Sequence, residues 1–163
     1  MPHIHKRYDF VVSVFIVRRS KVLLIYHKKY NEWLPIGGHI ELDEDPEEAL
    51  YREIKEECGL KVRILADCPN IGHGGVKPLP TPAYTDVHRI PPAHPALARK
   101  DWAHKHIAFI YFGIAQTYRV RLHVREHREY RWVSASELKK PEFKLTKSIL
   151  FYCRKALQKA ASR

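Results

Sequence analysis

The feature that most constrains this chain is an acidic segment that directly follows two consecutive glycines. Asp45 suits the cap position of a helix, and Pro46 suits the first helical position. Glu48 completes a capping-box spacing with Asp45, and Gly59 can end the helix in a left-handed conformation. These signals predict a helix over about residues 46–58. Its core-facing stripe recurs every four positions: Leu50, Ile54 and Cys58.

Three glutamates on this helix, Glu53, Glu56 and Glu57, are spaced by three and four residues. Their carboxylates therefore converge on one side, where they repel one another unless a cation lies among them. Oxygen ligands select a hard ion, so Mg²⁺, or Mn²⁺ in its place, is expected. The preceding loop can approach such a site closely because Gly37 and Gly38 lack side chains. The alternative is a solvated acidic face, which is what most acidic runs are.

The fixed positions of the segment resemble the signature box of the Nudix hydrolases. They are a glycine, a glutamate, an Arg-Glu-aliphatic triplet, a glutamate pair and a Gly-aliphatic pair: Gly38, Glu44, Arg52-Glu53-Ile54, Glu56-Glu57 and Gly59-Leu60. The resemblance implies a single Nudix domain over residues 1–163. It also implies an α/β fold, the Nudix-type α/β/α sandwich, with a mixed β-sheet between helices.

Individual roles follow from the box. Glu56 and Glu57 are expected to be the chief metal ligands, with Gly38 in the metal-binding loop and Glu53 positioning or deprotonating a water. Arg52 is expected to pair with Glu44 through a charge-assisted contact that holds the loop against the helix and orients Glu53. The alternative for Arg52 is an exposed surface arginine.

Hydrophobic patterning outside the box predicts a layered α/β domain. Strands are expected over residues 8–17, 22–27, 61–67, 83–90, 106–115, 118–123 and 130–133. A helical turn is expected at residues 134–138 and a final helix over residues 144–160. The inward positions of that helix are Leu145, Ile149, Tyr152, Cys153, Ala156 and Leu157.

A long proline-rich loop occupies about residues 68–102, interrupted only by the short strand expected within it. A loop of this length in a compact domain is usually functional or mobile. We expect it to shape the substrate opening, with Tyr84, His88 and Trp102 as groups on which a base can stack. His39, next to the metal loop, is a further candidate for a phosphate contact. The alternative is an ordered surface wrap that binds no ligand.

An additional carboxylate is expected across the cleft from the helix. In family members it often comes from the box helix itself or from a loop ahead of a late strand that contains tryptophan, and the matching stretch here ends at Trp132. Glu126 and Glu129 are the candidates, and Glu126 is preferred as a metal ligand. The alternative for both is an exposed charged turn.

The net charge of +11 indicates an anionic partner despite the acidic box. The C-terminal segment contains a single acidic residue, Glu142. Its basic residues are Lys139, Lys140, Lys144, Lys147, Arg154, Lys155, Lys159 and Arg163. Such a field attracts polyphosphates or RNA. The same pattern also describes the basic outer face of a soluble helix.

Other features limit the class of protein. No apolar run approaches the length of a membrane span, and three scattered cysteines without metal-ligand spacing suggest reduced thiols and a cytoplasmic location. The pairs His3-x-His5 and His104-x-His106 lack partners at zinc spacing, so no zinc site is expected. A homodimer is possible on general grounds alone.

The leading functional hypothesis is Mg²⁺-dependent hydrolysis of a pyrophosphate bond in a nucleoside diphosphate linked to another group, such as a nucleoside triphosphate or a nucleotide sugar. One alternative is an RNA 5′-end pyrophosphohydrolase or decapping enzyme, recruited by the basic C-terminus. A second alternative is a non-catalytic nucleotide sensor, which would not need the full glutamate set.

Overall fold

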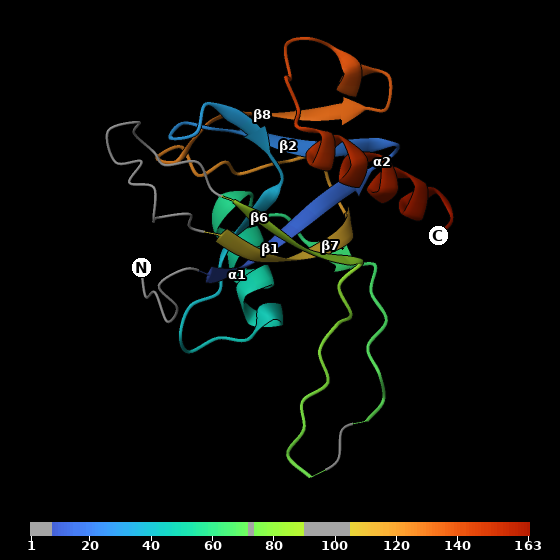
Figure 1. The fold of residues 1–163 in the computed structure, drawn as a ribbon. Helices are drawn as coiled ribbons and strands as arrows, with labels where there is room; N and C mark the ends of the chain where they lie inside the picture. Colours follow the sequence, from blue (N-terminus) through green and yellow to red (C-terminus); the bar gives the residue numbers. More distant parts are fainter. Residues whose placement is uncertain (1–7, 72–73, 90–104) are drawn as a thin grey trace.

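A computed structural model of the chain, which describes residues 8–71, 74–89 and 105–163, places one mixed sheet between two helices (Figure 1). The strands are β1 (Tyr8–Arg18), β2 (Lys21–His27), β3 (Glu32–Leu34), β4 (Ile36–His39), β5 (Val62–Ile64), β6 (Tyr84–Arg89), β7 (Lys105–Ala115) and β8 (His127–Ser134). The helices are α1 (Pro46–Glu57), the short η2 (Glu137–Lys139) and α2 (Lys147–Ala161). The predicted α/β sandwich is confirmed.

Strand β1 is the centre of the sheet. It pairs in parallel with β7 and antiparallel with both β2 and β4. Strands β5 and β6 extend the sheet from β7, while β3 and β8 pair with β2. The parallel β1–β7 pair and the antiparallel pairs around it make the sheet mixed, as predicted.

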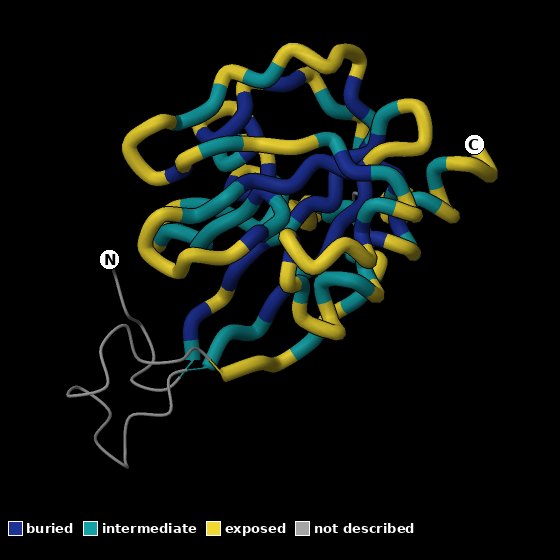
Figure 2. The backbone as a smooth tube through the Cα atoms, turned by 90° about the horizontal axis from the view of Figure 1, so that it is seen from above, coloured by how far each residue is buried: buried dark blue, intermediate teal, exposed yellow. Residues whose placement is uncertain are grey.

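The apolar run of β1 is continuous because both faces of the sheet are covered. Val11 and Phe15 face the core beneath α2, and Val12 and Val14 face the core beneath α1. Figure 2 shows this buried interior enclosed by exposed loops. The box helix therefore covers one face of β1 and the C-terminal helix covers the other.

Helix α1 forms as its sequence predicts. The Asp45 carboxylate accepts hydrogen bonds from the backbone N–H groups of Glu47 and Glu48, and the Glu48 carboxylate accepts one from the backbone N–H of Asp45. Gly59 ends the helix with φ +61°, a conformation that costs glycine little. The capping box thus fixes the residue at which α1 begins.

Helix α2 begins three residues later than predicted. Lys144 has φ +43°, which is incompatible with a helical turn, and the Thr146 hydroxyl caps the helix by accepting from the backbone of Ile149. Cys153 and Ala156 are buried beneath the helix, as expected from its apolar stripe. No helix among the described residues is long and apolar enough to cross a membrane.

Residues 118–123 do not form the predicted strand in the part of the chain that the structure describes. The backbone of Arg121 donates to the carbonyl of Cys58 at 2.8 Å, and that of His123 donates to the carbonyl of Glu57 at 3.1 Å. The segment therefore caps the end of α1 instead of joining the sheet. Strand β5 is also shorter than predicted, while β6 is confirmed.

Candidate active site

Two glycines in the middle of β4 let the backbone approach its neighbours closely. A Cβ on Gly37 would meet the carbonyl oxygen of Val12 and, at 2.9 Å, the Cα of Ser13 on β1. A Cβ on Gly38 would instead overlap the carboxylate of Glu53. Gly37 is therefore required by the packing of the sheet, and Gly38 by the space that the Glu53 carboxylate occupies.

Glu57 is a buried acid, 5% exposed, with both carboxylate oxygens engaged. Its Oε2 accepts a hydrogen bond from the backbone N–H of Gly37 at 2.9 Å. Its Oε1 lies 2.8 Å from Nε2 of His127, which is 1% exposed at the start of β8. Helix α1, the glycine turn and β8 therefore meet at this one carboxylate.

His127 is the site residue that the sequence did not reveal. Its Nδ1 has no hydrogen-bond partner among the described residues, so the contact to Glu57 is what anchors the ring. The residue lies in the charged stretch that was expected to supply an additional carboxylate. Nothing in the sequence of that stretch distinguishes this histidine from its charged neighbours. Its burial beside Glu57 follows from the β2–β8 pairing, which is a long-range feature.

Arg52 connects the loop to the helix. Its guanidinium binds Glu44 through two contacts, Nε to Oε2 at 2.9 Å and Nη2 to Oε1 at 2.6 Å. Nη1 donates to Glu53 Oε1 at 2.7 Å, and Nη2 also donates to the carbonyl of His39 at 2.9 Å. This geometry has the contacts expected of a group that orients Glu53 and fixes the loop.

Glu53 is costly to ionise in the absence of a metal. Burial raises its pKa to about 7, and the charges of Glu57 and Glu56 add to this effect. The hydrogen bond from Arg52 acts in the opposite direction but does not compensate. Glu56 is 56% exposed and reaches Arg52 only at 3.4 Å, so it lies at the solvent edge of the acidic group.

The structure brings one of the two predicted additional acids to the site. Ligand atoms of Glu57, Glu126 and His127 lie within 4.8 Å of one another. Glu129 instead binds Arg131 at 3.2 Å on an exposed part of β8. Glu126 is thus the acid that lies across from α1.

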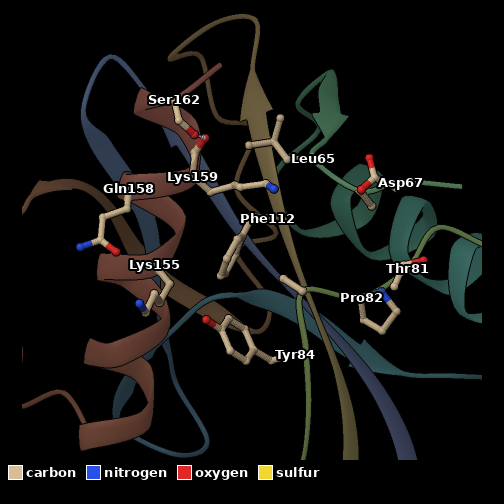
Figure 3. Close-up of a pocket in the computed structure, with 12 residues that line it drawn as sticks. Leu65, Asp67, Thr81, Pro82, Tyr84, Phe112, Lys155, Gln158, Lys159 and Ser162 are labelled. Carbon is tan, nitrogen blue, oxygen red and sulfur yellow. Dashed lines mark hydrogen bonds between the residues drawn. The ribbon is translucent and has the colours of Figure 1, made fainter.

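The predicted substrate residues are separated in space. Tyr84 lies on the face beneath α2, next to Phe112, in a pocket of about 460 Å³ that also includes Lys155 and Lys159 (Figure 3). His39 lies at the end of β4, where its Nε2 is 3.4 Å from a carboxylate oxygen of Asp9. Trp102 is outside the described residues.

The side chains present fit a hard divalent cation. The Glu53 carboxylate lies against Gly38, the Glu57 carboxylate accepts from the backbone of Gly37, and Glu126 approaches Glu57 from the turn before β8. A bound cation would favour the ionised form of Glu53, which burial and like charges disfavour. Carboxylate oxygens are the donors that Mg²⁺ and Mn²⁺ prefer.

Comparison with known proteins agrees with this geometry. The family model of the NUDIX domain matches residues 7–152. The crystal structure of a NUDIX family hydrolase from Clostridium perfringens superposes with a TM-score of 0.77 and 35% sequence identity, covering 92% of this chain and 96% of that one.

Two further similarities are more limited. The dihydroneopterin triphosphate pyrophosphohydrolase of E. coli is 16% identical with a TM-score of 0.63, covering 94% of this chain and 99% of that one, which shows a shared fold. The m7GpppN-mRNA hydrolase of Xenopus laevis is 48% identical over 54 residues, which is 33% of this chain. That match spans 17% of the length of the Xenopus protein.

Proposed function

This chain belongs to the NUDIX family, and from that premise we propose that it is an Mg²⁺-dependent hydrolase of a nucleoside diphosphate linked to another group. The observation that carries the proposal is the fixed position of Glu57. One of its oxygens accepts from the Gly37 backbone and the other contacts His127, so this acid is placed before any ligand arrives. A carboxylate fixed in this way can hold the cation that neutralises the phosphates during phosphoryl transfer.

The proposed ligands are Glu53, Glu56, Glu57 and Glu126, with the backbone of Gly38 beside them. Mg²⁺, when bound there, would neutralise the diphosphate and acidify a water molecule. Arg52 keeps Glu53 directed toward the turn, where this carboxylate is suited to hold or deprotonate the attacking water. Glu44 holds Arg52 in place by occupying two of its donor groups.

The test is turnover of a panel of nucleoside triphosphates, nucleotide sugars and dinucleoside polyphosphates with excess Mg²⁺, measured as released phosphate or nucleoside monophosphate. Glu57→Gln should lose more than about 100-fold in kcat/KM, because even partners of metal ligands cost about 10–100-fold. Glu129→Gln is the matched control, since Glu129 contacts Arg131 on an exposed strand. Wild-type turnover by a folded Glu57→Gln protein would reject the proposal.

A capped or triphosphorylated RNA 5′ end is the second candidate substrate. The chain has a net charge of +11 and the lysines at the start of α2 are exposed, while the partial match to a mRNA cap hydrolase of Xenopus laevis points to the same substrate class. RNA binding through these cations would weaken steeply with salt.

The two candidate substrates are separated by one comparison. Turnover of a capped oligonucleotide and of free nucleoside triphosphate is measured between low and high salt, with wild-type protein and with Lys144→Gln/Lys147→Gln. An RNA enzyme should lose activity on the capped oligonucleotide, but not on free nucleoside triphosphate, both at high salt and in the double lysine variant. Equal effects on both substrates would leave the small nucleotide as the substrate.

A further inference from the structure

A second group of metal-binding side chains lies at the other side of β4. Asp9 of β1 is directly paired with His106 of β7 in the parallel register. His39 of β4 is paired with Val11, two residues beyond Asp9, so the His39 and Asp9 side chains share one face of the sheet. That face is the one that packs beneath α2, opposite the box glutamates.

The ligand atoms of Asp9, His39 and His106 lie within 4.8 Å of one another. His39 Nε2 and Asp9 Oδ2 are 3.4 Å apart, and the rings of His39 and His106 have centroids 5.0 Å apart. Two ligands of a tetrahedral zinc ion are separated by roughly 3.4 Å, given bond lengths of about 2.1 Å. Because no pair is farther apart than 4.8 Å, a combined side-chain movement of at most about 1.4 Å would bring the most distant pair to that separation.

We propose that Asp9, His39 and His106 form a transition-metal site of the Zn²⁺ class, separate from the carboxylate site. Two imidazoles with one carboxylate suit Zn²⁺ or a neighbouring transition metal, whereas Mg²⁺ prefers oxygen donors alone. Asp9 is 6% exposed, and a buried carboxylate is stabilised by a cation that it contacts directly.

A simple ion pair accounts for these contacts less completely. The contact between His39 and Asp9 involves only two of the three residues, whereas the ring of His106 lies against His39 as well. A metal ion uses the neutral form of both rings and the charge of Asp9 together. The ion unites β1, β4 and β7 at one point, although the three residues are far apart in sequence.

The site has a structural consequence for the hydrolase centre. His39 follows Gly38 directly, and its carbonyl accepts from the same guanidinium, that of Arg52, that orients Glu53. A metal held by the His39 side chain would therefore fix the end of β4 from the face opposite the glutamates. Three protein ligands also leave a coordination position open for water or an anion.

The test uses metal-free full-length protein titrated with Zn²⁺ by calorimetry and with Co²⁺ by visible absorption, because Co²⁺ reports ligand geometry. All measurements use the Glu57→Gln background, which weakens binding at the carboxylate site. The expected result is one tight Zn²⁺ per chain and an intense tetrahedral Co²⁺ spectrum. Zinc should also raise the melting temperature.

His106→Gln and His39→Gln should each lower the affinity for Zn²⁺ by more than about 100-fold and abolish the Co²⁺ absorption bands, since each removes a direct ligand. His88→Gln is the matched control: its ring lies 5.4 Å from that of His106, but its Nδ1 contacts Asp86 at 2.8 Å. Circular dichroism establishes folding, and if one variant does not fold the other carries the test. Wild-type affinity and spectrum in a folded ligand variant would overturn the proposal.

Failure here is distinguishable from failure of the proposed hydrolysis. Loss of turnover in Glu57→Gln with the Zn²⁺ site intact supports both proposals. If turnover depends on Glu57 but Zn²⁺ does not bind at Asp9, His39 and His106, only the proposed Zn²⁺ site is rejected.

Discussion

Different donor groups lie against the two faces of β4. On the α1 face, Glu53 and Glu57 offer carboxylate oxygens that Arg52, His127 and the glycine backbone hold in position. On the α2 face, two histidines and one aspartate come together from three strands. One strand end therefore lies beside oxygen donors of the kind that suit a hard ion on one side and beside a nitrogen-rich cluster on the other.

The difference shows how each arrangement is encoded. The carboxylates of α1 follow one another within a single helix, so their spacing alone predicts that they converge. The histidine cluster depends on the parallel β1–β7 pair and on the antiparallel β1–β4 pair. Only the folded sheet brings its members together.

The largest effect that would sharpen this comparison is expected from Gly38→Ala. The added Cβ would overlap the Glu53 carboxylate, and displacement of a reacting group by about 1 Å can cost about 100-fold in rate. The melting temperature should change little, because the Glu53 side chain can rotate away. Paired measurements of kcat/KM and melting temperature test this.

Gly37→Ala is the matched comparison for that variant. Its Cβ would meet the backbone of β1, which cannot move aside, so the free energy of unfolding should fall by about 1–3 kcal/mol. If Gly38→Ala instead unfolds the protein while keeping activity per folded molecule, the assignment of the two glycines is wrong.

The next effect concerns His127. His127→Gln removes the ring that positions Glu57, so turnover should fall by about 10–100-fold. A purely structural role would lower stability at unchanged Mg²⁺ dependence, whereas a positioning role should raise the Mg²⁺ concentration needed for half-maximal rate. Measuring rate against Mg²⁺ in folded protein separates the two.

A smaller difference is expected between the two acids of the β8 turn. Glu126→Gln should lower turnover by about 10-fold, because Glu126 lies beside Glu57 and acts at the edge of the site. Glu129→Gln should leave turnover unchanged, because its carboxylate contacts Arg131. Equal kcat/KM in both variants would remove Glu126 from the proposed ligand set.

The smallest effect is a pH dependence of stability without metal. Glu53 has a pKa of about 7 in the folded protein and an ordinary value of 4.5 when unfolded. As pH rises through this window the unfolded chain releases the proton first, so the stability that Glu53 contributes is lost. In chelator, the melting temperature of Glu53→Gln relative to wild type should therefore increase from pH 5 to pH 8. A constant difference would contradict the raised pKa.

The sequence predicted what local chemistry determines. The limits of α1 follow from Asp45, Pro46 and Gly59, and the Arg52–Glu44 contact lies within the same box. The layered α/β fold is expected from the order of elements, and the mixed sheet from the family resemblance. The limits of α1 and the Arg52–Glu44 contact need only short-range contacts, whereas the sheet depends on the pairing of β1 with β7.

Long-range pairing explains what was missed. Residues 118–123 alternate like a strand, but their backbone groups bind the end of α1. His127 reaches Glu57 because β8 pairs with β2, and Tyr84 faces α2 because β6 pairs with β7. The spacing of histidines in the sequence likewise could not reveal the cluster of Asp9, His39 and His106, whose members come from separate strands.

The central claim is that Glu53 and Glu57 are gathered to hold a divalent cation, and Mn²⁺ binding tests it most directly. Free Mn²⁺ is measured by electron paramagnetic resonance in His106→Gln protein, in which the histidine cluster is disabled, and in the same protein with Glu53→Gln/Glu57→Gln added. We expect Mn²⁺ to bind to the first protein and its affinity for the second to be more than about 100-fold lower. Equal Mn²⁺ affinity in the two folded proteins would contradict it.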